Sequence, residues 1–217
     1  MTLAIFDLDN TLIGGDSDNL WGQFLCDQKL VDVAGFEAKN NQFYEDYKNG
    51  ALDIDAYLRF ALGPLKGQPR EVLDSWHRQF MRSVIEPIVL PKAEALIAKH
   101  RDRGHTLLII TATNVFITRP IAHALGIANL LGCEAEIMDG LYTGEPTGVP
   151  SYHGGKVTRL NEWLEKTGES MKGAYFYGDS QNDLPLLEIV DNPIAVDPDE
   201  TLRIRALDAG WPVISLR

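Results

Sequence analysis

Aspartates gather at two places in this 217-residue chain, each directly after a short apolar run. Asp7 and Asp9 follow the first run, and Asp179 and Asp183 follow a later one. Clustered carboxylates repel one another, so such a group is stable only around a cation or with raised pKa values. Because oxygen ligands alone suit a hard cation, the group predicts a Mg²⁺ site.

The same aspartates suit phosphoryl transfer. A carboxylate such as Asp7 can attack phosphorus and form an aspartyl-phosphate, which divides one difficult hydrolysis into two steps. Asp9, two residues further along, can protonate the leaving oxygen and later activate water. The hydroxyl of Thr111 and the ammonium of Lys156 can stabilise the negative charge of the remaining phosphoryl oxygens.

Short apolar runs alternate with helical segments in most of the chain. This alternation predicts an α/β fold with a doubly wound, mostly parallel sheet. Ligands bind such sheets at the carboxyl ends of the strands, so the polar residues that follow the strands are expected to meet at one edge. The predicted strands are residues 3–6, 107–110, 174–177, 194–196 and 213–214, and predicted helices cover residues 93–103 and 156–166.

The segment of residues 14–86 has a different pattern. Its aromatic and aliphatic residues recur at helical spacing and form no run typical of a buried strand. We therefore expect a catalytic core of residues 1–13 and 87–217 with an inserted α-helical cap domain of residues 14–86. Residues 134–150 are predicted to form a β-hairpin, because Asp139 and Gly140 make a turn between two short strands, residues 134–138 and 141–143.

The composition limits the kinds of molecule that the protein is expected to bind. Lys and Arg number 20 against 31 Asp and Glu, a net charge of −11, which would repel nucleic acid and anionic membrane surfaces. The two cysteines, Cys26 and Cys133, form neither a disulfide framework nor a zinc cluster. No run approaches the ~18 apolar residues of a membrane span, and no signal peptide precedes Asp7. We expect a cytoplasmic protein that acts on a small molecule.

Together these residues resemble a known family. Asp7-Leu8-Asp9-Asn10-Thr11, then Thr111, then Lys156, then Gly178 to Asp183 are similar, in this order, to the four motifs of the haloacid dehalogenase (HAD) superfamily. The helical insert resembles a type 1 cap, and the short hairpin leaves no room for a type 2 cap. The resemblance is to the phosphoserine-phosphatase-like subfamily IB. It implies a HAD-like, Rossmannoid core and a Mg²⁺-dependent phosphatase acting on a small phosphomonoester.

The resemblance also implies roles for single residues. Asp7 would be the nucleophile and a metal ligand, and Asp9 the general acid and base with its backbone carbonyl on the metal. Asp179 would be a further metal ligand, which Asp183 orients. The residues implied to bind the phosphoryl group are Thr111, Ala112, Lys156 and Asn182.

The substrate depends on the cap. In phosphoserine phosphatases an acidic residue nine positions after the nucleophile contacts the substrate amine, and here that residue is Asp16. The arginine that binds the substrate carboxylate is replaced by Ala61, with Arg59 two positions earlier, from where its side chain could still reach the substrate. An amine without a carboxylate is thus favoured, and Asp18 adds negative charge at the cap entrance. Histidinol phosphate fits this pattern best, and its imidazole would pack on aromatic residues such as Trp21.

Several alternatives stay open from the sequence. Phosphoserine, another small metabolite phosphate, and phosphotransfer to an acceptor hydroxyl would all use the same aspartyl-phosphate. A dehalogenase needs no acid at Asp9 and no metal ligand at Asp179. A phosphorylatable receiver domain has its phosphoacceptor after the third strand, and a non-catalytic binding module would be expected to lack one of the motif residues. The sequence does not indicate the oligomeric state.

Overall fold

The computed structural model of the protein describes residues 2–217 and contains a seven-stranded sheet in the order β4-β3-β2-β1-β5-β6-β7. All neighbouring strands are parallel except β3 and β4, which form an antiparallel hairpin. This confirms the predicted α/β fold with a mostly parallel sheet. The strands are β1 (Leu3–Phe6), β2 (Thr106–Asn114), β3 (Asn129–Met138), β4 (Leu141–Thr147), β5 (Tyr175–Gly178), β6 (Asn192–Val196) and β7 (Val213–Ile214).

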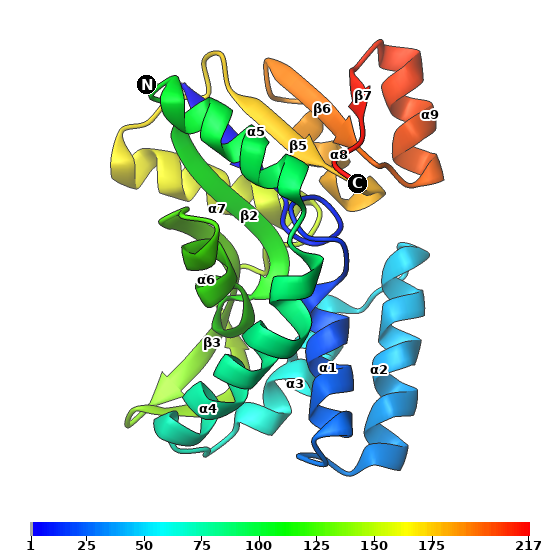
Figure 1. Cartoon of the computed structure of the whole chain (residues 1–217), viewed down its shortest axis with the longest axis vertical. Helices are drawn as coiled ribbons and strands as arrows, with labels where there is room; N and C mark the ends of the chain where they lie inside the picture. Colours follow the sequence, from blue (N-terminus) through cyan, green and yellow to red (C-terminus); the bar gives the residue numbers. More distant parts are fainter. Residues whose placement is uncertain (1) are drawn as a thin grey trace.

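Helices cover both faces of the sheet. Successive side chains of a strand point to opposite faces, so Ala4 and Phe6 of β1 pack in one apolar cluster and Leu3 and Ile5 in the other. Figure 1 shows α5 crossing in front of the sheet. The first cluster takes side chains from α5 (Pro91–Asp102) and α6 (Val115–Ala124), and the second from α7 (Gly154–Thr167), α8 (Leu184–Leu187) and α9 (Glu200–Ala209).

A helical insert follows β1 and lies below the sheet in Figure 1. Its aromatic residues Trp21, Phe24 and Phe80 share one buried cluster with Ile117 and Ile121 of α6. The insert is therefore anchored to the core by continuous apolar packing. Its helices are α1 (Ser17–Asp27), α2 (Val33–Lys48), α3 (Ile54–Leu62) and α4 (Arg70–Phe80), and a π-helical turn, Met81–Ile85, extends the last of them.

Two antiparallel segments connect the insert to the core. Ile13 forms a β-bridge with Val89, and the Gly14 N–H donates to the Ile88 carbonyl at 2.7 Å. The two connections thus run side by side, close to the boundaries expected at residues 14 and 86. The division into a core and a cap domain remains a prediction.

The hairpin is longer than the sequence indicates. β3 begins at Asn129 rather than at residue 134, and its first residues pair in parallel with β2 before the strand turns to pair with β4. The pairing with β2 is irregular around Gly132. The Thr113 carbonyl oxygen approaches Gly132 so closely that a Cβ there would lie 2.7 Å from it. Gly132 directly follows two leucines, and because glycine is uncommon inside strands, the sequence does not indicate that this half of β3 is a strand.

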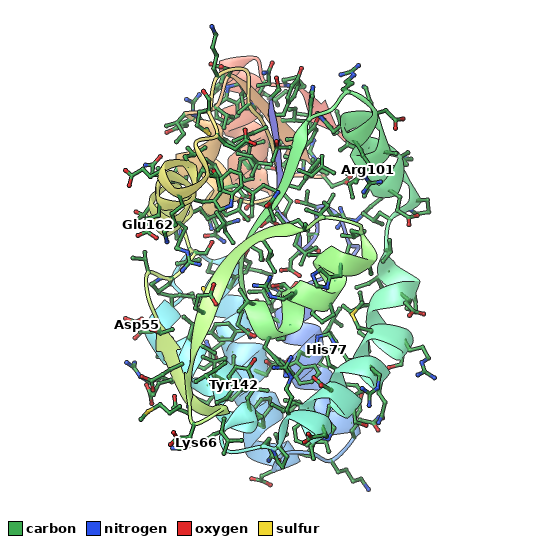
Figure 2. The ribbon with its side chains drawn as sticks, turned by 90° about the vertical axis from the view of Figure 1, so that its left-hand side faces the viewer. Asp55, Lys66, His77, Arg101, Tyr142 and Glu162 are labelled. Atoms are coloured by element: carbon green, nitrogen blue, oxygen red, sulfur yellow. The ribbon has the colours of Figure 1, made fainter. Side chains whose placement is uncertain are left out.

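The hairpin reaches the helical insert. The Gly67 N–H donates to the Tyr142 carbonyl at 2.9 Å, and Figure 2 shows Lys66 and Tyr142 at the same end of the molecule. Elsewhere, Cys26 and Cys133 are both buried and unpaired, as expected. No helix within residues 2–217 has the length and apolar character that a membrane crossing requires.

Candidate active site

The chain turns sharply where β1 ends, and this turn carries Asp7 and Asp9. Both residues are buried, at 6% and 7% exposure of the whole residue. Asn10 adopts a φ of 56°, in the left-handed region where asparagine is enriched. The Leu12 N–H then donates to the Leu8 carbonyl at 2.9 Å, which closes the turn. Leu8 is fully buried in the apolar core. It therefore anchors the turn and fixes the backbone positions of the aspartates on either side of it.

Lys156 lies between two carboxylates. Its Nζ is 2.7 Å from Asp7 Oδ1 and 2.6 Å from Asp183 Oδ1. Burial opposes the charge of Lys156, but Asp183 and Asp7 outweigh this effect and raise its pKa. Burial raises the pKa of Asp7 well above its usual range, against the opposing influence of Lys156. The Asp7 Oδ2 atom accepts no hydrogen bond from residues 2–217, so one oxygen of this carboxyl group has no protein partner.

Asp183 orders the loop after β5. Its Oδ2 accepts hydrogen bonds from the Asp179 N–H at 3.1 Å and from the Ser180 N–H at 3.4 Å. A Cβ at Gly178 would lie 2.5 Å from the same oxygen, so only glycine allows this approach. Burial, with the charge of Asp7, raises the pKa of Asp179 well above its usual range.

Three carboxylates converge at this edge of the sheet. One oxygen each from Asp7, Asp179 and Asp183 lies within 4.8 Å of the other two. Lys156 supplies one positive charge against three negative ones, so the group retains an excess of buried negative charge. A hard divalent cation with oxygen ligands fits this set. Asp7 and Asp179 are the two carboxylates best placed to bind it, because both oxygens of Asp183 already accept hydrogen bonds, from Lys156 and from the Asp179 N–H.

The Asp9 carboxylate is held by its own partners. Its Oδ1 accepts from the Ser17 N–H at 2.6 Å, at the amino end of α1, where the helix dipole favours an anion. Its Oδ2 accepts from the hydroxyls of Thr111 at 3.2 Å and Thr113 at 2.9 Å. Thr113 was not predicted as a site residue, since a second hydroxyl at a strand end carries no distinct signal.

A cavity extends from Asp7 and Asp9 into the helical insert. The core contributes Asp7, Asp9 and residues 111–113 to its lining. No Lys, Arg or His side chain in the described part of the chain lines it. The insert contributes Asp16, Asp18, Asn19, Asn40, Phe43, Tyr44, Tyr47, Leu52, Ile54 and Tyr57.

Two acidic residues of the insert, Asp16 and Asp18, line this cavity. Asp16 precedes α1 and accepts from the Asn19 N–H at 2.8 Å. Burial, with the nearby charge of Asp9, raises the pKa of Asp16 to about 7. Asp18 lies in the first turn of α1, and burial together with Asp16 raises its pKa well above the usual range. A cation inside the cavity would relieve both effects.

Two residues expected to contact the substrate lie elsewhere. Trp21 is 1% exposed and packs against the rings of Phe24, Phe80 and Phe116, so it belongs to the apolar core. Arg59 is more than half exposed, and its Nε pairs with the Glu145 carboxylate of β4 at 2.9 Å. Neither residue lines the cavity, so the structure does not place either of them against a substrate there.

Asn182, which was predicted to bind the phosphoryl group, is buried outside the cavity lining. It is 2% exposed and does not line the cavity, and its Oδ1 has no hydrogen-bond partner within residues 2–217. The residues that the sequence did not indicate lie mainly on α2, where Asn40, Phe43, Tyr44 and Tyr47 occupy one face at helical spacing. That spacing was visible, but it equally fits the packing of a cap core.

Comparison with known proteins shows the family to which the chain belongs. The haloacid dehalogenase-like hydrolase family matches residues 4–188. A histidinol-phosphatase from Neisseria meningitidis is 48% identical over 99% of this chain and 99% of its own. The crystal structure of a protein of unknown function from Bordetella pertussis superposes with a TM-score of 0.93 at 41% identity, covering 100% of both chains. A substrate-bound phosphoserine phosphatase shares the fold, with a TM-score of 0.72 at 18% identity over 100% of this chain and 93% of the other. The chain belongs to the haloacid dehalogenase-like hydrolases.

Proposed function

We propose that this enzyme is a Mg²⁺-dependent phosphatase that hydrolyses histidinol phosphate through an aspartyl-phosphate. The cavity beyond Asp7 carries the proposal, since it holds Asp16 and Asp18 and no basic side chain of the described residues. Such a cavity accommodates an amine and offers no cationic partner to a carboxylate, which phosphoserine has and histidinol phosphate lacks. The name of the 48% identical relative supports the same substrate.

In the first step, Asp7 attacks phosphorus, and the bond from phosphorus to the substrate's alcohol oxygen breaks. Lys156 holds Asp7 Oδ1, which leaves Oδ2 to attack. A protonated Asp9 donates its proton to the leaving oxygen. Thr111 has a single hydroxyl proton, so when it turns toward a phosphoryl oxygen it releases Asp9 Oδ2 for this transfer, while Thr113 keeps the carboxyl group in place.

In the second step, water attacks phosphorus and the bond to Asp7 breaks. Asp9 takes a proton from that water and so returns to its starting state. Inorganic phosphate leaves, and the Asp7 carboxylate is free for another turnover. We infer that residues 14–86 act as the cap that separates this reaction from bulk water, since the cavity is lined from both sides.

The metal would be held by Asp7 and Asp179 and by the backbone carbonyl of Asp9. When bound, Mg²⁺ supplies positive charge to the phosphoryl oxygens. Asp183 acts as a positioning residue, because it binds both the Asp179 N–H and Lys156. Lys156, Thr111 and Ala112 would surround the transferred group.

The test is phosphate release from histidinol phosphate and phosphoserine, each with Mg²⁺ and with EDTA. We expect kcat/KM to be higher for histidinol phosphate by about tenfold or more, because phosphoserine would bury an unpaired carboxylate. EDTA should remove the activity, and Asp7→Asn should remove both turnover and covalent labelling. Arg59→Ala is the matched control outside the cavity and should retain the preference.

Two results would contradict the proposal. A preference for phosphoserine would refute the assigned substrate. Full activity of Asp7→Asn would refute the aspartyl-phosphate.

A further inference from the structure

The cavity contains a second carboxylate, Asp18, for which phosphoryl transfer has no use. Asp18 is 6% exposed, and its Oδ1 has no hydrogen-bond partner within residues 2–217. A buried carboxylate oxygen without a partner is costly, so its retention in a cavity wall indicates a ligand that completes it.

A free donor lies next to it. The Nδ2 of Asn19 is also buried without a partner in the described chain, whereas its Oδ1 accepts from Gln23 Nε2 at 2.8 Å. The bond from Gln23 fixes the side-chain amide with its oxygen occupied and its nitrogen free. Asp18 and Asn19 therefore offer one acceptor and one donor, both in the lining of the same cavity.

Asp18 and Tyr57 both belong to the part of the cavity wall that the insert forms. Burial and then the charge of Asp18 raise the pKa of Tyr57 on α3, and the two side chains interact directly. For Tyr47 on α2, the charge that bears most strongly on its raised pKa after burial is that of Asp179. Tyr47 lines the same cavity, together with Asp7 and Asp9 of the core.

The walls in this part of the cavity favour a flat ring. Phe43, Leu52 and Ile54 line the cavity with apolar surface, and no basic side chain of the described chain neutralises Asp18 there. An aromatic heterocycle that carries one N–H and one bare ring nitrogen matches both the walls and the two free polar atoms. A neutral imidazole has this pair of atoms.

We infer that Asp18 and Asn19 form a specificity subsite for a nitrogen heterocycle, which accepts from the ring N–H and donates to the other ring nitrogen. Asp16, nearer the catalytic aspartates, is then left for the aliphatic amine. The inference rests on the proposed function and identifies which residues select the substrate. The preferred substrate class is a phosphomonoester with both an amine and a heterocyclic base.

The first test compares two substrates in the Mg²⁺-loaded enzyme. Histidinol phosphate carries the ring, and O-phosphoethanolamine carries the amine and phosphate without it. In Asp18→Asn, the ratio of their kcat/KM values should fall by about 10- to 100-fold, the range expected for loss of one charged hydrogen bond. Asp27→Asn, an exposed aspartate at the end of α1, is the matched control and should leave the ratio as it is.

The second test measures binding without turnover. Histidinol, titrated calorimetrically into the metal-free protein, should bind more weakly to Asp18→Asn by a similar factor, and more weakly to Asn19→Ala by about threefold or more. Asn19→Ala carries the test alone if Asp18→Asn does not fold. A wild-type enzyme that binds histidinol without hydrolysing its phosphate would refute the proposed function and leave the subsite standing. Equal binding of histidinol by wild type and both variants would overturn the subsite.

Discussion

Lys156 provides the sharpest test of the charge arrangement. Its Nζ contacts Asp7 and Asp183 at 2.7 and 2.6 Å, and the side chains of Lys156, Asp7 and Asp183 are 3%, 8% and 1% exposed. Lys156→Met keeps the length of the side chain and leaves two buried carboxylates without their cation. Removing one partner of a buried pair costs about 3–5 kcal/mol of unfolding free energy. For a chain of this size, such a loss lowers Tm by about 6–20 °C.

The loss should depend on pH. Burial raises the pKa of Asp7 and Lys156 opposes the rise, so the substitution raises this pKa further in the folded state. A carboxyl group with a higher pKa when folded than when unfolded destabilises the fold most above the folded pKa. The destabilisation shrinks as pH falls and the group takes up a proton. The deficit of Lys156→Met should therefore be larger at about pH 8 than at about pH 5.

The assay is urea unfolding in EDTA, followed by tryptophan fluorescence at both pH values. Lys166→Met, on an exposed position of the same helix, is the control and should change the unfolding free energy by less than about 0.5 kcal/mol. A loss below about 1 kcal/mol for Lys156→Met, or the same loss at both pH values, would refute the reasoning.

Three further predictions follow from buried or cavity-lining groups. Trp21→Ala should lower the unfolding free energy by about 3–5 kcal/mol in urea titrations, while the folded variant keeps its substrate preference; a changed preference would return Trp21 to the site. Asp16→Asn should unfold at higher urea than wild type above about pH 7, because the pKa of Asp16 is raised to about 7, and the gain should fade toward about pH 4; a constant gain would exclude titration of Asp16 as its cause. Thr113→Val should lower kcat about tenfold with little change in KM, measured by phosphate release, because Thr113 holds Asp9; a rise in KM alone would speak against this positioning role.

The core side of the candidate site could be predicted because the topology of the sheet determines it. Asp7, Thr111 and Asp179 are far apart in the sequence, yet Asp7 and Asp179 directly follow β1 and β5, and Thr111 lies in the carboxyl-terminal half of β2. These strands are neighbours, with β1 in the middle, so their carboxyl ends coincide. Short apolar runs followed by polar residues indicate such ends without any knowledge of side-chain packing.

The cap side of the site could not be predicted in the same way. Asp18 and Trp21 are three residues apart on α1, and helical spacing alone does not say which of them faces the cavity. The answer depends on tertiary packing: Trp21 contacts Phe116 of α6, which turns Asp18 toward the cavity. A Cβ at Gly22 would lie 2.4 Å from Asn40 Oδ1, so close contact with α2 fixes the helix further.

Arg59 shows a second limit. Its partner Glu145 lies in β4, which extends to Thr147, whereas the sequence predicts a strand that ends at residue 143. The missing residues include Pro146 and Gly144, which are rare inside strands and are tolerated here at an irregular edge. An ion pair across 86 positions depends on that extension, and no local pattern reveals it.

The net charge of −11 takes on a specific meaning at the site. Two groups of carboxylates, one around Asp7 and Asp179 and one at Asp16 and Asp18, are buried with Lys156 as the cation that pairs with the first group. The first group is suited to a metal that also attracts phosphate, and the second to the basic end of a substrate. A ligand with phosphate at one end and nitrogen bases at the other therefore relieves both groups at once. A phosphate ester without the bases leaves Asp16 and Asp18 without a partner. We therefore expect selectivity to depend on the cost of these unpaired carboxylates as much as on favourable interactions with the preferred substrate.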